Sequence, residues 1–264
     1  MVSGKALRVP AYGRRAAVVV ALIALAAPAA ATADSTVVQV RDGRLRIDGI
    51  PATPSMVEIR YRTAAEAGFG GVSDRFVVRD EGGATPLGGD CASIDPTRVS
   101  CDARPITSIS AALGDFDDVL ALNSSEGDGV PRRYGTDLRG QTGDDVIKGG
   151  IGDDVIRGEA GRDSLAGWSG DDLIFGGPSV DGLIGFAGDD TLNGDQGRDV
   201  LFGQKGRDLM FGGPQNDILL ARDGFRDPQL VCGPGKRQRA FTDRHDPRPR
   251  RCTQPKPKGK RKKK

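Results

Sequence analysis

The distribution of hydrophobic and polar positions changes along the chain. Between residues 34 and 125, short apolar clusters are separated by glycine, proline and aspartate, a pattern that predicts short β-strands joined by turns. The clusters comprise Val37, Val38 and Val40; Leu45 and Ile47; Val57, Ile59 and Tyr61; and Phe76, Val77 and Val78. From residue 140 the pattern becomes strictly periodic, and this part of the chain says most about fold and function.

Residues 140–220 divide without gaps into nine units of nine residues. The first position is glycine in all nine units, and the fourth is glycine in seven, with Ser179 and Gln215 as the exceptions. The sixth position is always aspartate, and the eighth is always aliphatic or methionine. A period this regular indicates a repeating structure. Positions seven to nine suit a three-residue strand with its middle side chain facing inward, and positions one to six suit a turn.

This repeat, G-G-x-G-x-D-x-U-x, closely resembles the calcium-binding nonapeptide of RTX (haemolysin-type) proteins throughout 140–220. The region between Cys91 and Asp118 also looks like that of secreted actinobacterial proteins of this kind. The resemblance implies an all-β fold, a right-handed parallel β-roll (solenoid) in which two consecutive repeats make one coil. We expect an N-terminal β-rich region to cap this roll and a disordered basic tail to follow it.

The resemblance also implies the metal ligands, because calcium takes six to eight oxygens from carboxylates and carbonyls. Stacking each repeat on the second one after it arranges the aspartates in two columns. The first column is Asp145, Asp163, Asp181, Asp199 and Asp217, and the second is Asp154, Asp172, Asp190 and Asp208. The expected glycine ligands are Gly143, Gly152, Gly161, Gly170, Gly188, Gly197 and Gly206. One calcium ion between each neighbouring pair of aspartates gives up to about seven ions.

The charge of the repeats explains why they would need the metal. Residues 140–220 carry 15 acidic and 6 basic side chains, a net charge of −9. Coils stacked about 4.8 Å apart would bring these carboxylates into mutual repulsion without cations. We therefore expect the segment to be loose without calcium and to fold when calcium binds. A calcium-independent β-solenoid is the alternative, although it would not need an aspartate at every turn.

The segments that flank the repeats are less regular. Asp115, Asp117 and Asp118 could hold an outlying calcium ion or could form an ordinary acidic turn. After Leu220 the repeat decays, because Arg226 stands where the sixth-position aspartate is expected. The few large side chains of the roll could either cover its faces or form a binding surface; they are Trp168, Phe175, Phe186, Phe202 and Phe211.

Four cysteines favour an oxidising compartment and disulfide bonds. Three pairings are open, and proximity in the sequence favours Cys91–Cys101 and Cys232–Cys252. A structural zinc site is the competing interpretation, but the chain has no C-x-x-C motif and a single histidine, His245.

The segment 1–33 has the features of an export signal. Four basic residues precede an apolar run from Ala16 to Ala27, and small residues end in Ala31-Thr32-Ala33. This order predicts a secretory signal peptide, cleaved after Ala33 and exported by the general or the twin-arginine route. The run of about 12 residues is shorter than the roughly 20 that a membrane-spanning helix needs. We therefore expect a secreted, extracellular protein, with or without attachment to the cell surface.

Charge is distributed unevenly over the chain. From residue 221 onward there are 16 basic and 4 acidic side chains, and the last eleven residues contain seven of the basic ones. This basic end could simply aid solubility, or it could bind anionic cell-envelope polymers by electrostatic attraction.

We expect five segments in all. They are a signal peptide (1–33), a β-rich N-terminal region with a disulfide loop (34–135), the RTX calcium-binding β-roll (136–228), a disulfide-closed C-terminal cap (229–253) and the disordered basic tail (254–264).

The sequence does not favour an enzyme. The chain contains no H-E-x-x-H zinc-protease motif and no G-x-S-x-G lipase motif, and His245 stands alone among charged residues. Long apolar helices of a pore-forming toxin are also absent after residue 33. We expect a non-catalytic calcium-binding module with a structural, adhesive or surface role. The alternative is a secreted hydrolase whose active site lies in the 34–135 region.

Overall fold

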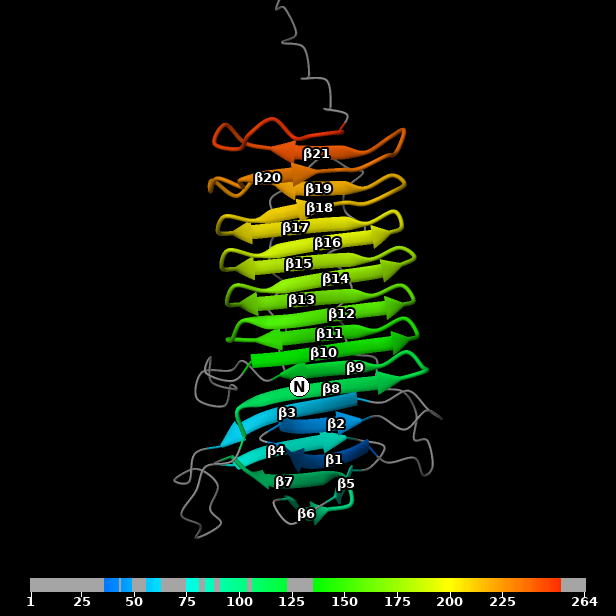
Figure 1. Ribbon diagram of the computed structural model, residues 1–264, viewed down its shortest axis with the longest axis vertical. Helices are drawn as coiled ribbons and strands as arrows, with labels where there is room; N and C mark the ends of the chain where they lie inside the picture. The colour runs from blue at the N-terminus through cyan, green and yellow to red at the C-terminus, as the bar shows by residue number, and fades with distance from the viewer. Residues whose placement is uncertain are drawn as a thin grey trace, which may run out of the picture.

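The computed structural model describes residues 36–42, 44–48, 56–62, 75–80, 84–87, 91–103, 106–122 and 135–252. The expected signal peptide and the expected basic tail lie outside the described residues. Every regular element in the described part of the chain is a β-strand, and the strands stack along one long axis (Figure 1). None of the described residues belongs to a helix that could span a membrane.

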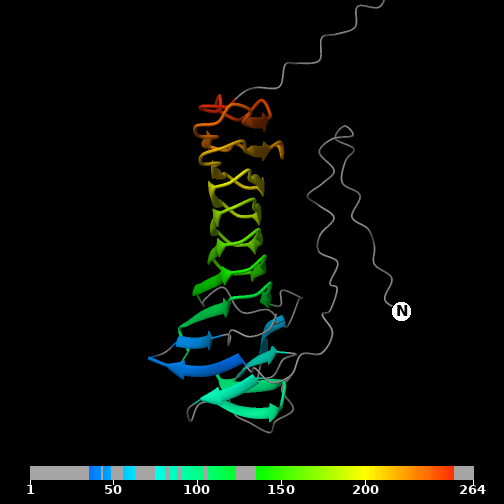
Figure 2. The ribbon, with the colours of Figure 1, turned by 90° about the vertical axis from the view of Figure 1, so that its right-hand side faces the viewer.

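The strands form two sheets. Figure 2, turned by 90°, looks roughly along the strands of the roll and so shows its two sheets nearly edge-on. We call them sheet A, with the order β20-β18-β16-β14-β12-β10-β8-β2-β1-β5, and sheet B, with the order β21-β19-β17-β15-β13-β11-β9-β3-β4-β7-β6. From β8 onward the even-numbered strands belong to sheet A and the odd-numbered strands to sheet B. The chain therefore passes from one sheet to the other at every turn.

The roll consists of parallel strands in a register that recurs with every second nonapeptide. Ile156 pairs with Ile174 in sheet A, and Leu165 pairs with Leu183 in sheet B. This arrangement confirms the predicted all-β parallel roll. Its strands are β8 (Ser108–Gly114), β9 (Val119–Leu122), β10 (Gly135–Thr142), β11 (Val146–Gly150), β12 (Asp154–Ala160), β13 (Ser164–Ser169), β14 (Leu173–Pro178), β15 (Gly182–Ala187), β16 (Thr191–Gln196), β17 (Val200–Lys205), β18 (Leu209–Phe211), β19 (Ile218–Ala221), β20 (Gln229–Val231) and β21 (Arg239–Thr242).

The eighth-position side chains form the core of the roll. Each is at most 1% exposed, and they are Ile147, Ile156, Leu165, Ile174, Leu183, Leu192, Leu201, Met210 and Leu219. Burying one such side chain contributes roughly 1.5–3 kcal/mol. Because each coil encloses only one inward aliphatic side chain per strand, the roll needs few aromatic residues. Two of the larger rings, Trp168 and Phe186, stack on neighbouring strands with their centroids 5.0 Å apart.

The N-terminal strands continue both sheets. β2 (Arg44–Asp48) pairs in parallel with β8, and β3 (Met56–Arg62) pairs in parallel with β9. Beyond them the pairing is mostly antiparallel, through β1 (Thr36–Arg41), β4 (Arg75–Asp80), β5 (Ala84–Leu87), β6 (Cys91–Asp95) and β7 (Arg98–Asp102). This region covers the strand edges at one end of the roll, which would otherwise be open to pairing with other chains.

Both disulfides are the pairs that proximity in the sequence favoured. Cys91 and Cys101 lie opposite each other in the β6–β7 hairpin. Cys232 and Cys252 join the chain just after β20 to the last described residue. No cysteine is free, so the alternative of a zinc site is wrong.

The first-position glycines are required by space rather than by backbone conformation. A β-carbon on Gly185 would lie 2.1 Å from Oδ2 of Asp190, the aspartate of the same repeat. A β-carbon on Gly140 or on Gly167 would lie at the same distance from Oδ2 of Asp145 or Asp172, respectively. The invariant glycine of position one and the invariant aspartate of position six are therefore one structural unit.

We predict that Gly185→Ala lowers the free energy of unfolding of the calcium-saturated protein by about 1–3 kcal/mol, because the methyl group displaces a buried carboxylate. Gly135→Ala is the matched control, since a β-carbon there meets nothing within 4 Å. Urea denaturation in excess calcium measures both variants. Equal stability of the two variants would contradict this explanation of the glycine.

Candidate metal centre

The turns bring all nine sixth-position aspartates into the two expected columns. The first column lies in the turns that lead into sheet B, and the second in the turns that lead into sheet A. Each of the nine side chains is at most 2% exposed. The sequence pattern therefore locates a set of carboxylates that is buried, although aspartate is rarely found fully buried without a partner.

Backbone hydrogen bonds join the members of each column. Along the first column as far as Asp217, and along the second column, the N–H of an aspartate donates to Oδ1 of the aspartate one coil further along, at 2.9 Å from Asp145 to Asp163 and 2.9 Å from Asp172 to Asp190. The same bond recurs from Asp163 to Asp181 at 2.8 Å. These bonds fix Oδ1 of every carboxylate after the first in each column and do not involve Oδ2.

The second oxygen of nearly every carboxylate has no hydrogen-bond partner. Buried Oδ2 atoms without a partner belong to Asp145, Asp163, Asp172, Asp181, Asp190, Asp199, Asp208, Asp217 and Asp227. Asp154 differs, because its Oδ2 accepts the Gly150 N–H at 2.8 Å and its Oδ1 accepts the Thr136 hydroxyl. A buried, unsatisfied carboxylate oxygen costs several kcal/mol unless a proton or a cation neutralises it.

A backbone carbonyl stands close to most of the free oxygens. The position that a β-carbon on Gly140 would take lies 2.1 Å from Asp145 Oδ2 and 2.7 Å from the carbonyl oxygen of Gly158 in the next coil. Gly185 has the same relation to Asp190 Oδ2, at 2.1 Å, and to the Gly203 carbonyl oxygen, at 2.9 Å. Carboxylate and carbonyl oxygens are the donors that calcium prefers, so the residues present fit this ion.

The fourth-position glycines form a second line beside each column. Their φ angles are positive in Gly143, Gly161, Gly170, Gly188 and Gly206. A β-carbon on Gly161 would lie only 1.5 Å from the Gly143 carbonyl oxygen, and one on Gly170 would lie 2.1 Å from that of Gly152. Both conformation and space thus require glycine here. That these carbonyls ligate calcium, those of Gly152 and Gly197 included, stays a prediction.

Burial raises the pKa of every aspartate in the columns. The pKa rises to about 8 for Asp172 and Asp181, to about 7 for Asp145, Asp199 and Asp208, and to about 6 for Asp154, Asp163, Asp190 and Asp217. Loss of hydration is the largest cause in each case. Without a cation, part of each column would therefore hold protons at neutral pH.

The sequence left one member of the first column undecided. Asp118, just before β9, is 2% exposed, and its N–H donates to Asp145 Oδ1 at 2.9 Å. It therefore extends the first column by one coil. Asp117 remains exposed beside it and accepts the Asp144 N–H at 2.8 Å. The spacing between Asp118 and Asp145 is 27, whereas successive repeat members such as Asp145 and Asp163 are spaced by 18, which is why the period does not reveal Asp118.

The expectation that Arg226 takes the sixth position is wrong. Asp227 is fully buried, and its Oδ1 accepts the Asp208 N–H at 2.9 Å, so the second column continues through this aspartate. The spacing from Asp208 is 19, because the turn holds one extra residue before Asp227. A search that allows one inserted residue on each side of the aspartate, before the buried Leu230, would have found it.

Comparison with known protein families agrees with this geometry. Residues 136–165, 149–183 and 184–219 match the sequence model of the family described as RTX calcium-binding nonapeptide repeat (4 copies). The matched residues make up about a third of the chain. No curated protein sequence matches the chain. The match confirms the resemblance of the repeats, whereas the likeness to actinobacterial proteins in particular stays a prediction.

We predict that acid stabilises the calcium-free protein. The folded columns bind more protons than the unfolded chain between about pH 4 and pH 8, because their pKa values rise from 3.8 to as much as about 8. Stability without calcium is therefore greatest at the acid end of this window and is lost as the pH rises through it.

Circular dichroism in excess chelator, with thermal melts at pH 5 and pH 8, measures this effect. We expect more β-structure and a higher melting temperature at pH 5. Calcium-saturated protein should show the reverse trend, because protons compete for the same oxygens. If the calcium-free protein is more stable at pH 8 than at pH 5, the buried carboxylates do not destabilise it as proposed.

Proposed function

We propose that this chain, whose residues 136–219 are RTX calcium-binding nonapeptide repeats, is a secreted, non-catalytic protein that calcium folds into a rigid extracellular rod. One observation carries the proposal: two columns of buried aspartates, in which eight of the nine sixth-position carboxylates have a buried Oδ2 without a hydrogen-bond partner. Calcium supplies the positive charge that these columns need, and the sheets and turns supply fixed oxygens.

The ligands in this proposal are the nine sixth-position aspartates together with Asp118 and Asp227. Backbone carbonyls of the neighbouring turns, those of the fourth-position glycines included, complete the coordination. We call the space between two neighbouring aspartates of a column a gap. With one aspartate added to each column, the first column has five gaps and the second has four. The protein would then hold up to nine calcium ions rather than the seven that the repeats alone predict.

Secretion is supported by two independent features. The segment 1–33 has the order of a signal peptide, and all four cysteines form disulfides, which persist in oxidising compartments. In this proposal the β-rich region at 34–135 caps one end of the roll, and the segment at 229–253 closes the other.

The non-catalytic role rests on the composition of the chain and on the position of its single histidine. His245 is exposed in the C-terminal turn, where its Nδ1 lies 3.3 Å from an Asp243 oxygen. In the interactions of the described residues its side chain meets Asp243 and Arg244, neither of which carries a hydroxyl or thiol nucleophile. A surface or adhesive role needs no active site and would depend on the shape and charge of the rod.

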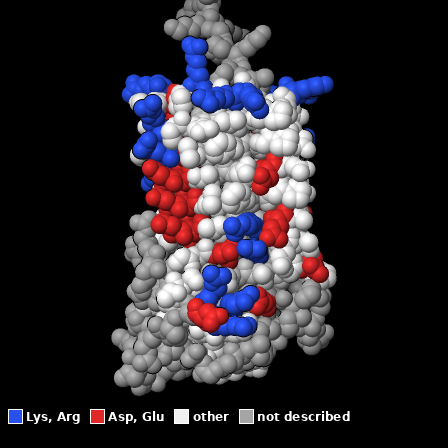
Figure 3. Space-filling view, in the orientation of Figure 1, with Lys and Arg blue, Asp and Glu red and all other residues white. Residues whose placement is uncertain are grey.

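The charge of the surface suggests where such a rod would attach. Basic side chains gather around the C-terminal end of the roll, whereas acidic ones lie along its flank (Figure 3). Exposed basic residues at this end include Lys236, Arg237, Arg239 and Arg250. Together with the basic sequence at 254–264 they would attract anionic cell-envelope polymers.

We predict that Asp190→Asn weakens calcium binding at the two gaps that Asp190 flanks, by about tenfold or more, because each loses one charged ligand. The amide oxygen can still accept the Asp172 N–H that now donates to Asp190 Oδ1, so the ladder is preserved. Isothermal titration calorimetry, with the ions counted, measures the effect.

The control is Asp189→Asn, the adjacent residue, which is exposed and whose Oδ1 accepts the Arg207 N–H at 2.8 Å. This variant has the same change of charge in the same turn and should bind calcium like the wild type.

The wild-type protein should gain β-structure when calcium is added. The proposed function would be wrong if the wild-type protein binds no calcium, or if its circular dichroism spectrum is the same with and without chelator.

We predict further that deleting residues 254–264 reduces binding to anionic wall polymers, and that the remaining binding weakens as salt is raised. Sedimentation with purified wall fragments, with and without the deletion, measures this. Equal binding by both proteins at all salt concentrations would exclude the tail as the attachment site.

A further inference from the structure

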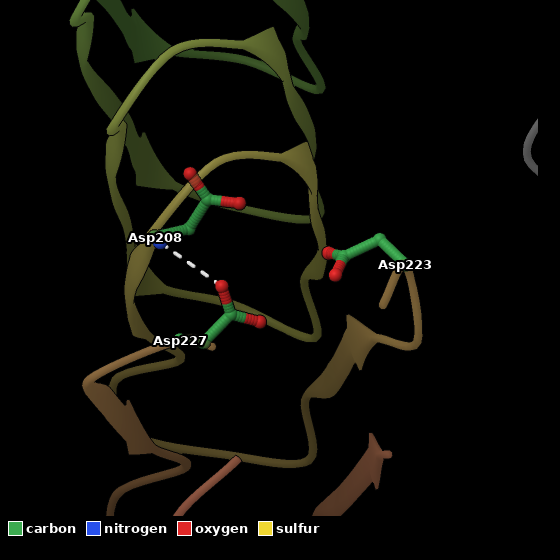
Figure 4. Close-up of side chains that lie close together, drawn as sticks. All are labelled: Asp208, Asp223 and Asp227. Carbon is green, nitrogen blue, oxygen red and sulfur yellow. Dashed lines mark hydrogen bonds between the residues drawn. The ribbon is translucent and has the colours of Figure 1, made fainter. Parts of the chain in front are cut away.

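The last turn of the second column differs from those before it. This turn, between β19 and β20, holds two more residues than a repeat turn, one before Asp227 and one after it, and contributes two aspartates, Asp223 and Asp227. Together with Asp208 of the preceding coil they form a group of three carboxylates. One oxygen from each lies within 4.8 Å of the others, and Figure 4 shows the three side chains converging.

The nonapeptide pattern does not predict this group. The register of β17 and β19 aligns Asp223 with Lys205, the third position of a repeat. In the earlier turns of the second column the third position is Ile151, Ser169 and Ala187. Among these aligned turns, only the last one places a carboxylate at this point.

The three carboxylates are held in place by their other oxygens. Asp208 Oδ1 accepts the Asp190 N–H at 3.0 Å, and Asp227 Oδ1 accepts the Asp208 N–H at 2.9 Å (Figure 4). Asp223 Oδ1 accepts the N–H of Phe225, two residues further along its own turn, at 2.8 Å. The backbone thus orients all three side chains without neutralising them.

The remaining oxygen of each carboxylate has no hydrogen-bond partner. This applies to Oδ2 of Asp208, Asp223 and Asp227, of which the first and last belong to fully buried side chains. Three buried oxygens without hydrogen-bond partners therefore lie close together, and three negative charges meet at one place. Such an arrangement is unfavourable unless a cation occupies it.

The surrounding protein does not supply that cation. Across the residues described, no basic side chain forms an ion pair with any of the three carboxylates. The nearby guanidinium of Arg222 donates to the Thr242 carbonyl at 3.0 Å and lies over the Phe241 ring. The next turn adds Asp246, whose Oδ1 accepts the Asp227 N–H at 3.1 Å, so the local potential is more negative still.

We propose that Asp223 makes the last gap of the second column, between Asp208 and Asp227, a three-carboxylate divalent-cation site that binds calcium more tightly than the gaps between repeat turns. The site rests on the proposed calcium-binding function of the columns, because Asp208 and Asp227 belong to the second column. Its third carboxylate sets it apart, since affinity for calcium rises with the number of charged ligands.

The test is Asp223→Asn in the full chain, titrated with calcium by isothermal titration calorimetry and with terbium by luminescence. The amide oxygen can keep the bond from Phe225, so the turn is preserved. We expect the tightest ion to bind at least about tenfold more weakly while the other ions keep their affinities. Asp171→Asn is the control, because Asp171 is exposed in an earlier turn of the second column and its Oδ1 accepts the Asp189 N–H in the same way.

Asp223→Ser, whose hydroxyl can also accept the Phe225 N–H, is the second variant. A titration of Asp223→Asn that superimposes on the wild type would overturn the site while leaving the proposed function intact. Loss of β-structure at saturating calcium in both variants would also overturn it, because Asp223 would then serve the turn rather than an ion. A wild type that binds no calcium would overturn both proposals together.

Discussion

The structure depends on burying negative charge at regular intervals. Each turn of the roll buries a carboxylate, and in all but the turn of Asp154 a backbone N–H fixes one oxygen while the other has no hydrogen-bond partner. The remaining features of the repeat follow from this arrangement. Glycine at position one leaves room for the carboxylate, glycine at position four lets successive turns stack closely, and the eighth-position aliphatic side chain closes the interior.

The sequence was sufficient for the roll because every repeat carries the same local requirements. Two nine-residue units per coil set the register, and the pairings of Ile156 with Ile174 and Leu165 with Leu183 show it. The column members outside the repeats were harder to find. Asp118 and Asp227 occupy their places at spacings of 27 and 19, where long-range pairing of the sheets outweighs the local period.

The N-terminal region marks the limit of reasoning from sequence in another way. Its apolar clusters predicted strands, but not that β2 and β3 would each pair in parallel with a strand of the first coil. That choice depends on the edges of β8 and β9, which lie far along the chain from β2 and β3. A local hydrophobic pattern cannot predict the pairing of residues that stand far apart in the sequence, such as Leu45 and Ile109.

Protons and calcium would relieve the same buried charge but would not produce the same molecule. A proton neutralises one carboxylate oxygen and adds no bond to the neighbouring turn. A divalent ion needs six or more oxygens, and the free Oδ2 of one coil stands near a carbonyl of the next, so filling its coordination joins two coils. In a solenoid each coil contacts only its neighbours, and stability is a sum of such contacts. Calcium would therefore strengthen every interface along the axis, whereas acid would only remove a repulsion within it.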